Sequence, residues 1–381
     1  MKRKLLSALL CVSMAAALFA GCGDKPAEPT TGTPDASGTP DAASTEVSKP
    51  QESGTDEEML IYLVSKGFQH QYWQAVYQGA LEAAAEYGVK MEMVGPPSES
   101  DIQEQVQMLN NAINLKPAAI GLAALDTEAC MDLIKVAQDS KIPIIGFDSG
   151  VPNAPEGAIY ANASTDNYAA GELAAEETYK LIESKITDAK EPVRIGVMSQ
   201  DATSEAILNR GYGFVDKMKA LAEAAGKKVS VEGHTNFVDK CGGTVDGADV
   251  IIEVVVPAAV QAELSVADGS ALLNKKDIIA VYASNQFSGE GLVNADANLH
   301  KLGADGVIGV AFDSGKVIMD AIKSGTLSGA VTQDPIAIGY KTVELAVAAA
   351  KGETVSDVDT GCKWYTAENM EDEDIAPILY E

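Results

Sequence analysis

The chain has 381 residues, of which 28 are Lys or Arg and 56 are Asp or Glu, and its formal net charge at pH 7 is −28. A chain this acidic is not expected to bind nucleic acid or an anionic lipid surface, because both carry negative charge themselves. Its length allows two domains, each with its own hydrophobic core.

Residues 1–21 have the pattern of a secretion signal. A basic stub at residues 2–4 precedes an apolar run at 5–19, which is short for a membrane span. The run leads into Ala20-Gly21-Cys22, which resembles a bacterial lipobox and predicts a lipid anchor on Cys22. The alternative is an ordinary signal peptide with an incidental cysteine. We expect the anchor to hold the protein on the extracytoplasmic face of the cell membrane.

The segment over 22–58 is predicted to be a tether that begins at the lipidated cysteine. Between residues 23 and 57, Val47 is the only aliphatic residue larger than Ala, and Pro, Thr, Ser, Gly, Asp and Glu dominate. Such a composition cannot bury enough apolar surface to fold. A long acidic tether favours a Gram-positive surface over a periplasm.

The cysteines do not predict a disulfide framework or a metal site. Three of the five lie beyond the tether, at Cys130, Cys241 and Cys362, and none has Cys-x-x-Cys spacing. An odd number of thiols cannot all pair. We therefore expect these cysteines to be mostly small buried apolar side chains, and a single disulfide between two of them is the alternative. We expect neither a metal nor a cofactor.

Short apolar runs alternate with helical patterns from residue 59 onward, which is typical of parallel sheets flanked by helices. An apolar stripe at helical spacing, Trp73, Val76, Ala80 and Ala84, predicts a helix after the first run. Ser100 with Gln103 predicts a capping box at the next helix. No element is assigned over 234–273. The predicted strands are 60–64, 91–94, 118–122, 142–147, 194–198, 278–282, 307–312 and 329–332.

Polar and aromatic residues follow these strands, where ligands bind in open α/β sheets. Their order and spacing resemble the type I periplasmic binding proteins of the ribose-binding kind. The segments that carry the resemblance are 66–73 (KGFQHQYW), 146–150 (GFDSG), 165–167 (TDN), 209–214 (NRGYGF), 283–285 (ASN), 311–315 (AFDSG) and 331–335 (VTQDP).

The resemblance implies two doubly wound α/β lobes joined by a three-strand hinge, with crossings near Thr165, Gln333 and Asp359. The first lobe would comprise 59–165 plus 334–358, and the second 166–333 plus 359–381. The lobes would close on a monosaccharide or similar polyol, and a monomer would deliver it to the transmembrane subunits of an ABC permease. A sensor that presents a sugar or a furanose-like autoinducer to a membrane receptor would use the same clamp and is the alternative.

The family's ligand-binding positions fall on residues of types that suit a sugar, whose apolar faces stack on rings and whose hydroxyls meet planar donors and acceptors. Ser149 stands where many ribose binders have Arg, so ribose itself is not implied. The implied ligand-binding residues are His70, Tyr72, Trp73, Asp148, Thr165, Arg210, Asn285, Asp313 and Gln333.

Structural roles compete with these assignments. Trp73 also begins the apolar helix stripe, Asp148 and Asp313 could cap the helices that follow, and Arg210 could pair with a carboxylate on its own helix. Phe237 is an uncertain third stacking ring. A secreted hydrolase is the rival class, but the sequence has no Gly-x-Ser-x-Gly, His-Glu-x-x-His or phosphate-loop motif.

Overall fold

The computed structural model describes residues 58–381. The predicted signal peptide, Cys22 and all but the last residue of the predicted tether lie outside the described residues. Within 58–381, no helix combines the length and the apolar character needed to cross a membrane.

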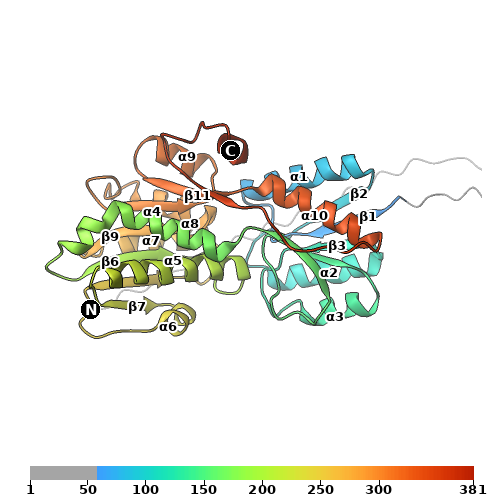
Figure 1. Cartoon of the computed structure of the whole chain (residues 1–381), viewed down its shortest axis with the longest axis horizontal. Helices are drawn as coiled ribbons and strands as arrows, with labels where there is room; N and C mark the ends of the chain where they lie inside the picture. Colours follow the sequence, from blue (N-terminus) through green and yellow to red (C-terminus); the bar gives the residue numbers. More distant parts are fainter. Residues whose placement is uncertain (1–57) are drawn as a thin grey trace, which may run out of the picture. The chain divides into compact units, whose positions relative to one another are not determined.

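The described chain forms two sheets (Figure 1). All strands of the first are parallel, and so are those of the second except for β13. The first sheet has the order β12-β5-β4-β3-β1-β2, and the second has the order β13-β11-β10-β9-β6-β8-β7, in which β13 runs antiparallel to β11. The first sheet contains β1 (Leu60–Val64), β2 (Lys90–Val94), β3 (Ala119–Leu122), β4 (Ile144–Phe147), β5 (Ile159–Ser164) and β12 (Val358–Asp359). The second contains β6 (Val193–Met198), β7 (Val229–Gly233), β8 (Val250–Val255), β9 (Ile278–Ala283), β10 (Ile308–Phe312), β11 (Gly329–Gln333) and β13 (Cys362–Tyr365).

Helices cover both faces of the first sheet, which together with them we call the first lobe. Ile61 and Leu63 of β1 pack in one apolar cluster with α1 and α10, while Tyr62 and Val64 pack in another with α2 and α3. Because successive residues of a strand point to opposite faces, a strand buried on both faces is a continuous apolar run. The helices of this lobe are α1 (Gln71–Tyr87), α2 (Ile102–Leu115), α3 (Met131–Asp139) and α10 (Pro335–Ala350).

The second sheet is covered in the same way and forms the second lobe. One face packs against Phe214 and Phe237 of α5 and α6, and the other packs against Leu292 and Ile318 of α8 and α9. A short 3-10 helix, Ala376–Ile378, follows the last strand. The helices are α4 (Asn167–Thr187), α5 (Glu205–Ala224), α6 (Thr235–Cys241), α7 (Ala262–Leu273), α8 (Gln286–Asp296) and α9 (Lys316–Lys323).

One helix pair in each lobe is packed through glycine. A Cβ on Gly79 of α1 would lie 1.9 Å from the carbonyl oxygen of Ile336, and one on Gly339 of α10 would lie 1.9 Å from that of Val76. Gly171 of α4 and Gly213 of α5 stand in the same relation in the second lobe. Helix α10 therefore lies beside α1 although the two are far apart in sequence (Figure 1).

The chain passes between the sheets three times, as the resemblance implied. β5 ends at Ser164 before α4 of the second lobe, β11 ends at Gln333 before α10 of the first, and β12 ends at Asp359 before β13. The Thr165 hydroxyl donates to the Gly361 carbonyl over 3.2 Å, so the first and third crossings lie side by side. The predicted fold of two doubly wound lobes joined by a three-strand hinge is confirmed.

One local expectation turns out differently. The capping box of Ser100 and Gln103 is wrong, because α2 has Asp101 at its N-cap and no side-chain cap. The Ser100 hydroxyl instead accepts a hydrogen bond from the Val260 N–H of the second lobe over 2.7 Å. All three cysteines of the described chain are free thiols, so no bridge forms among them.

Candidate functional site

The loops that follow the strands of both lobes converge on one cavity. First-lobe side chains come from the loops after β1, β2 and β4 and from the start of α1, and second-lobe side chains come from α5 and the carboxyl ends of β9, β10 and β11. The cavity is lined by Lys66, His70, Tyr72, Trp73, Glu99, Asp148, Ile207, Arg210, Asn285, Asp313 and Gln333. Eight of the nine predicted site residues therefore line the cavity. Thr165 does not line it but donates a hydrogen bond to Gln333, which does.

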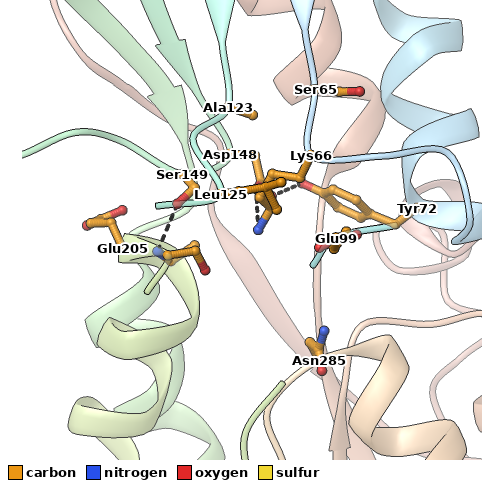
Figure 2. A network of polar contacts seen from close by, with 12 residues as sticks. Ser65, Lys66, Tyr72, Glu99, Ala123, Leu125, Asp148, Ser149, Glu205 and Asn285 are labelled. Carbon is orange, nitrogen blue, oxygen red and sulfur yellow. Dashed lines mark hydrogen bonds and ion pairs between the residues drawn. The ribbon is translucent and has the colours of Figure 1, made fainter. Parts of the chain in front are cut away.

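Tyr72, Lys66 and Asp148 point toward one another at the first-lobe side of the cavity (Figure 2). The Tyr72 hydroxyl donates to Asp148 Oδ1 over 2.7 Å, and Lys66 Nζ lies 3.1 Å from Asp148 Oδ2. Burial and the nearby Asp148 carboxylate raise the pKa of Tyr72, so the phenol stays a neutral donor. Burial alone would lower the pKa of Lys66, but Asp148 and Glu99 raise it, so the ammonium stays charged.

A chain of hydrogen bonds runs from Trp73 across to the second lobe. The indole Nε1 donates to Glu99 Oε1 over 2.8 Å, Gln200 Nε2 donates to Glu99 Oε2 over 2.8 Å, and Asn285 Nδ2 donates to Gln200 Oε1 over 2.7 Å. The Trp73 side chain is both core and cavity wall, because it packs edge-on against Phe147 and also lines the cavity.

Arg210 and Asp313 form the second-lobe side of the cavity. Arg210 Nε donates to Asn167 Oδ1 over 2.8 Å, and its guanidinium lies 4.0 Å from the centre of the Phe312 ring. One of its terminal nitrogens is 3.6 Å from Asp313 Oδ2. None of these partners is a carboxylate of α5, so the expected alternative of pairing within its own helix is wrong.

Asp313 is held by amide donors. It accepts hydrogen bonds from the Gln286 N–H over 3.1 Å and from Gln333 Nε2 over 2.8 Å. The carboxylate can only accept, so the nitrogen of the Gln333 amide must face Asp313, and Thr165 then donates to Gln333 Oε1 over 3.1 Å. Burial raises the pKa of Asp313, although Arg210 and Gln333 oppose the shift. The helix that follows, α9, has no side-chain cap, so the capping alternative for Asp313 is wrong.

Sequence reasoning missed three polar residues of this site. Lys66 was noticed only as part of a motif, and Glu99 and Gln200 were not singled out at all. A charged residue in a predicted loop is usually exposed to solvent, so the sequence gives no reason to place Glu99 in a site. Its burial involves Trp73 and Gln200, which are distant from it in sequence. Phe237 is fully buried in the core of the second lobe and does not line the cavity.

The cavity between these side chains has a volume of about 20 Å³, which is room for about one water molecule. Pockets for small organic ligands are typically ~300–1,000 Å³. The side chains of the two lobes therefore meet one another directly in this arrangement, and a larger guest needs the lobes to move apart. Within residues 58–381, no cluster of His, Cys, Asp and Glu is arranged to hold a metal ion.

The model of the periplasmic binding protein domain matches residues 61–354. The D-allose-binding periplasmic protein of Escherichia coli is 22% identical over 301 residues, which cover 78% of this chain and 86% of that protein. A solved structure from Brachyspira murdochii, described as an ABC transporter, LacI family transcriptional regulator, is 36% identical with a TM-score of 0.71 over 85% of this chain and 99% of that one. A carbohydrate transporter solute-binding protein from Agrobacterium radiobacter, solved in complex with D-arabinose, is 29% identical with a TM-score of 0.70 over 85% of this chain and 100% of that one.

Proposed function

The chain belongs to the periplasmic binding protein family, and from this premise we propose that it captures a monosaccharide or similar polyol by hinge closure and delivers it to an ABC permease. One observation carries the proposal: aromatic, carboxylate, amide and guanidinium side chains from both lobes line a single cavity. A solute-binding protein from Agrobacterium radiobacter, similar over most of both chains, holds D-arabinose.

The chemistry of these side chains suits an uncharged, hydroxyl-rich guest. Asp148 and Asp313 accept hydrogen bonds from hydroxyl groups, and Arg210 donates two parallel bonds to neighbouring oxygens. Asn285, Gln333 and His70 can both donate and accept. The rings of Tyr72 and Trp73 offer apolar faces to the C–H face of a sugar ring. Each of these side chains is proposed to contact the ligand, with Thr165 holding Gln333.

Binding would require an opening and a closing step. A guest larger than the present cavity would enter with the lobes apart, and contacts from both lobes would then favour the closed arrangement. The three crossings are short, so rotation about them is the simplest route. We propose that the lobes divide near Thr165, Gln333 and Asp359, as the sequence suggested.

We further propose that the protein works as a monomer held by a lipid on Cys22 at the extracytoplasmic face of the membrane. The support is the motif and the tether composition of the sequence. Metabolic labelling with a radioactive fatty acid tests this: label should enter the wild-type protein and be absent from the Cys22→Ser variant.

The binding function is tested by a thermal-shift screen against pentoses, hexoses and polyols, followed by calorimetry on the hits. A ligand that binds only the folded protein must raise its melting temperature, by RT ln(1 + [L]/Kd) in free energy. If no sugar or polyol of the panel raises the melting temperature, the proposal is wrong. Hydrolysis of glycosides by the purified protein would support the rival enzyme class.

A further inference from the structure

Glu99 is a buried carboxylate that both lobes contact. It lies between β2 and α2 and is 6% exposed, and it lines the cavity. Its two oxygens accept from different lobes, Oε1 from the Trp73 indole and Oε2 from the Gln200 amide, each over 2.8 Å. His70 Nε2 is 3.7 Å from Oε1. Its hydrogen-bond donors are neutral groups.

The other charged groups of the cavity are paired. Lys66 lies 3.1 Å from Asp148, and Arg210 lies 3.6 Å from Asp313. The lining of the cavity therefore has two cations and three carboxylates, and Glu99 is the carboxylate that has no cation of its own. Asp201, whose Oδ2 is 3.3 Å from Gln200 Nε2, adds further negative charge just behind it. The lining therefore contains one carboxylate more than it contains Lys and Arg side chains.

We infer that Glu99 is a specificity-determining residue that restricts the ligand to uncharged or amino sugars and excludes sugar acids and sugar phosphates. The inference rests on the proposed function and deepens it. A buried carboxylate repels an anionic guest strongly because little water remains to screen the charge. A hydroxyl can donate to the free lone pairs of the carboxylate, and an ammonium group gains an ion pair.

Closure makes the restriction effective. The Gln200 bond to Glu99 joins the two lobes, so the carboxylate is most completely buried when the lobes meet around the guest. An acidic sugar would then have to be enclosed with an uncompensated negative charge beside it. Its dissociation should be fast, while its encounter with the open lobes is only moderately slowed.

The wild-type protein gives the first test. Matched series that differ only in charge are compared by calorimetry at pH 7.5: D-galactose, D-galactosamine and D-galacturonate, and the corresponding D-glucose, D-glucosamine and D-glucuronate. We expect the amino sugar to bind as well as the neutral sugar or better, and the uronate to bind at least ~10-fold more weakly, which corresponds to ~1.4 kcal/mol. Equal or tighter binding of the uronate overturns the inference and leaves the proposed function standing. If neither these sugars nor any pentose or polyol of the thermal-shift panel binds, both are overturned.

Two variants then assign the effect to Glu99. Glu99→Gln removes the charge and keeps the size, and we expect the ratio of neutral to uronate affinity to fall ~10-fold or more. The double variant Glu99→Gln with Gln200→Glu moves the carboxylate from Glu99 to its hydrogen-bond partner in the second lobe. The hydrogen bond between the lobes can then form again, with the donor and the acceptor exchanged. We expect the double variant to regain most of the ratio.

A merely structural role for Glu99 gives a different result. It would lower all affinities together and leave the neutral-to-uronate ratio unchanged, and that outcome overturns the inference. Folding is checked by thermal denaturation and by the fluorescence of Trp73 in a Trp364→Phe background, since the chain has 2 Trp residues. If Glu99→Gln does not fold, the inference is still tested by the order in which the wild-type protein and the double variant bind the neutral sugar, the amino sugar and the uronate.

Discussion

Asp148 and Asp313 share a positive φ at equivalent positions in opposite lobes. Each follows the last residue of a buried strand, β4 or β10, and each has a positive φ, 57° for Asp148 and 71° for Asp313. The left-handed region is costly for most side chains, and strained residues of this kind concentrate at functional sites. The turn aims both carboxylates into the cavity between the lobes.

We predict that Asp148→Asn and Asp313→Asn each weaken sugar binding by at least ~2 kcal/mol, or ~30-fold in Kd, because charge-assisted hydrogen bonds to the ligand are lost. Asn is chosen because it tolerates a positive φ, so the turn itself is kept. Calorimetry with the sugar found in the screen measures the effect. Unchanged affinity in both variants would remove the aspartates from the site model.

Tyr380 links a loop of the second lobe to a cavity residue of the first. Its backbone pairs with Ser314 and Gly315, with the Gly315 N–H donating to its carbonyl over 2.9 Å, and its ring centre is 6.1 Å from that of Tyr72 in an edge-on contact. We predict that Tyr380→Ala weakens sugar binding ~3–10-fold through loss of this contact, while Tyr380→Phe keeps nearly full affinity.

Tyr340→Ala is the matched control for this prediction. Tyr340 also makes an aromatic contact, but its ring partner is Tyr87, which does not line the cavity, and its hydroxyl bonds to Glu86. Its loss should leave the Kd unchanged. Equal weakening by the two alanine variants would mean that Tyr380 acts only on general stability.

Arg194 of β6 forms ion pairs with three carboxylates of the second lobe. Its side chain is 12% exposed and lies 2.7 Å from Glu253, 3.2 Å from Glu232 and 3.1 Å from Asp277. We predict that Arg194→Met lowers the free energy of unfolding by ~2 kcal/mol at pH 7, because three partly buried carboxylates are left close together. Urea denaturation measures the loss. The control Lys316→Met removes an exposed pair and should change stability by less than ~0.5 kcal/mol.

Asp268 of α7 carries a carboxylate oxygen that is buried without a hydrogen-bond partner among the described residues, and burial raises its pKa. A raised pKa means that the folded protein holds this proton more tightly than the unfolded chain does. The stabilising effect of protonation is complete below the ordinary pKa of 3.8 and is lost as the pH rises through the raised value.

Asp268→Asn should therefore raise the melting temperature at pH 7, by about 2 °C at most because the group is partly hydrated. The gain should shrink as the pH falls toward 4. Calorimetric scans across pH 4 to 7.5 check both points, since a gain that is constant over this range would show that the charge is not its cause.

The strands could be predicted well where the sheet is buried on both faces. The apolar runs at 60–64, 278–282 and 329–332 need no knowledge of their neighbours, and they match β1, β9 and β11 within one residue. The elements within 234–273 could not be assigned. There β8 alternates buried and half-buried residues near the edge of its sheet, so its pattern is weaker.

The site could be predicted only as far as the resemblance reached. It placed Asp148, Asn285 and Asp313 at the cavity, because these lie within two residues of a strand end, and it placed His70 in the loop between β1 and α1. Glu99 lies in a loop before α2, and nothing local distinguishes it from a solvated glutamate such as Glu104. Its burial involves Trp73 of the first lobe and Gln200 of the second, which only the tertiary structure brings to it.

The second crossing, from β11 to α10, determines the order in which the two lobes can be completed. Helix α10 and strand β12 belong to the first lobe but come after all the parallel strands of the second, and Ile338, Val343 and Ala346 of α10 complete the first lobe's core. While the chain emerges from its amino end, the first lobe keeps an apolar face open until α10 has been made, which is after all the parallel strands of the second lobe. Neither lobe is a contiguous stretch of sequence, so the first lobe cannot complete its core before most of the second has been synthesised.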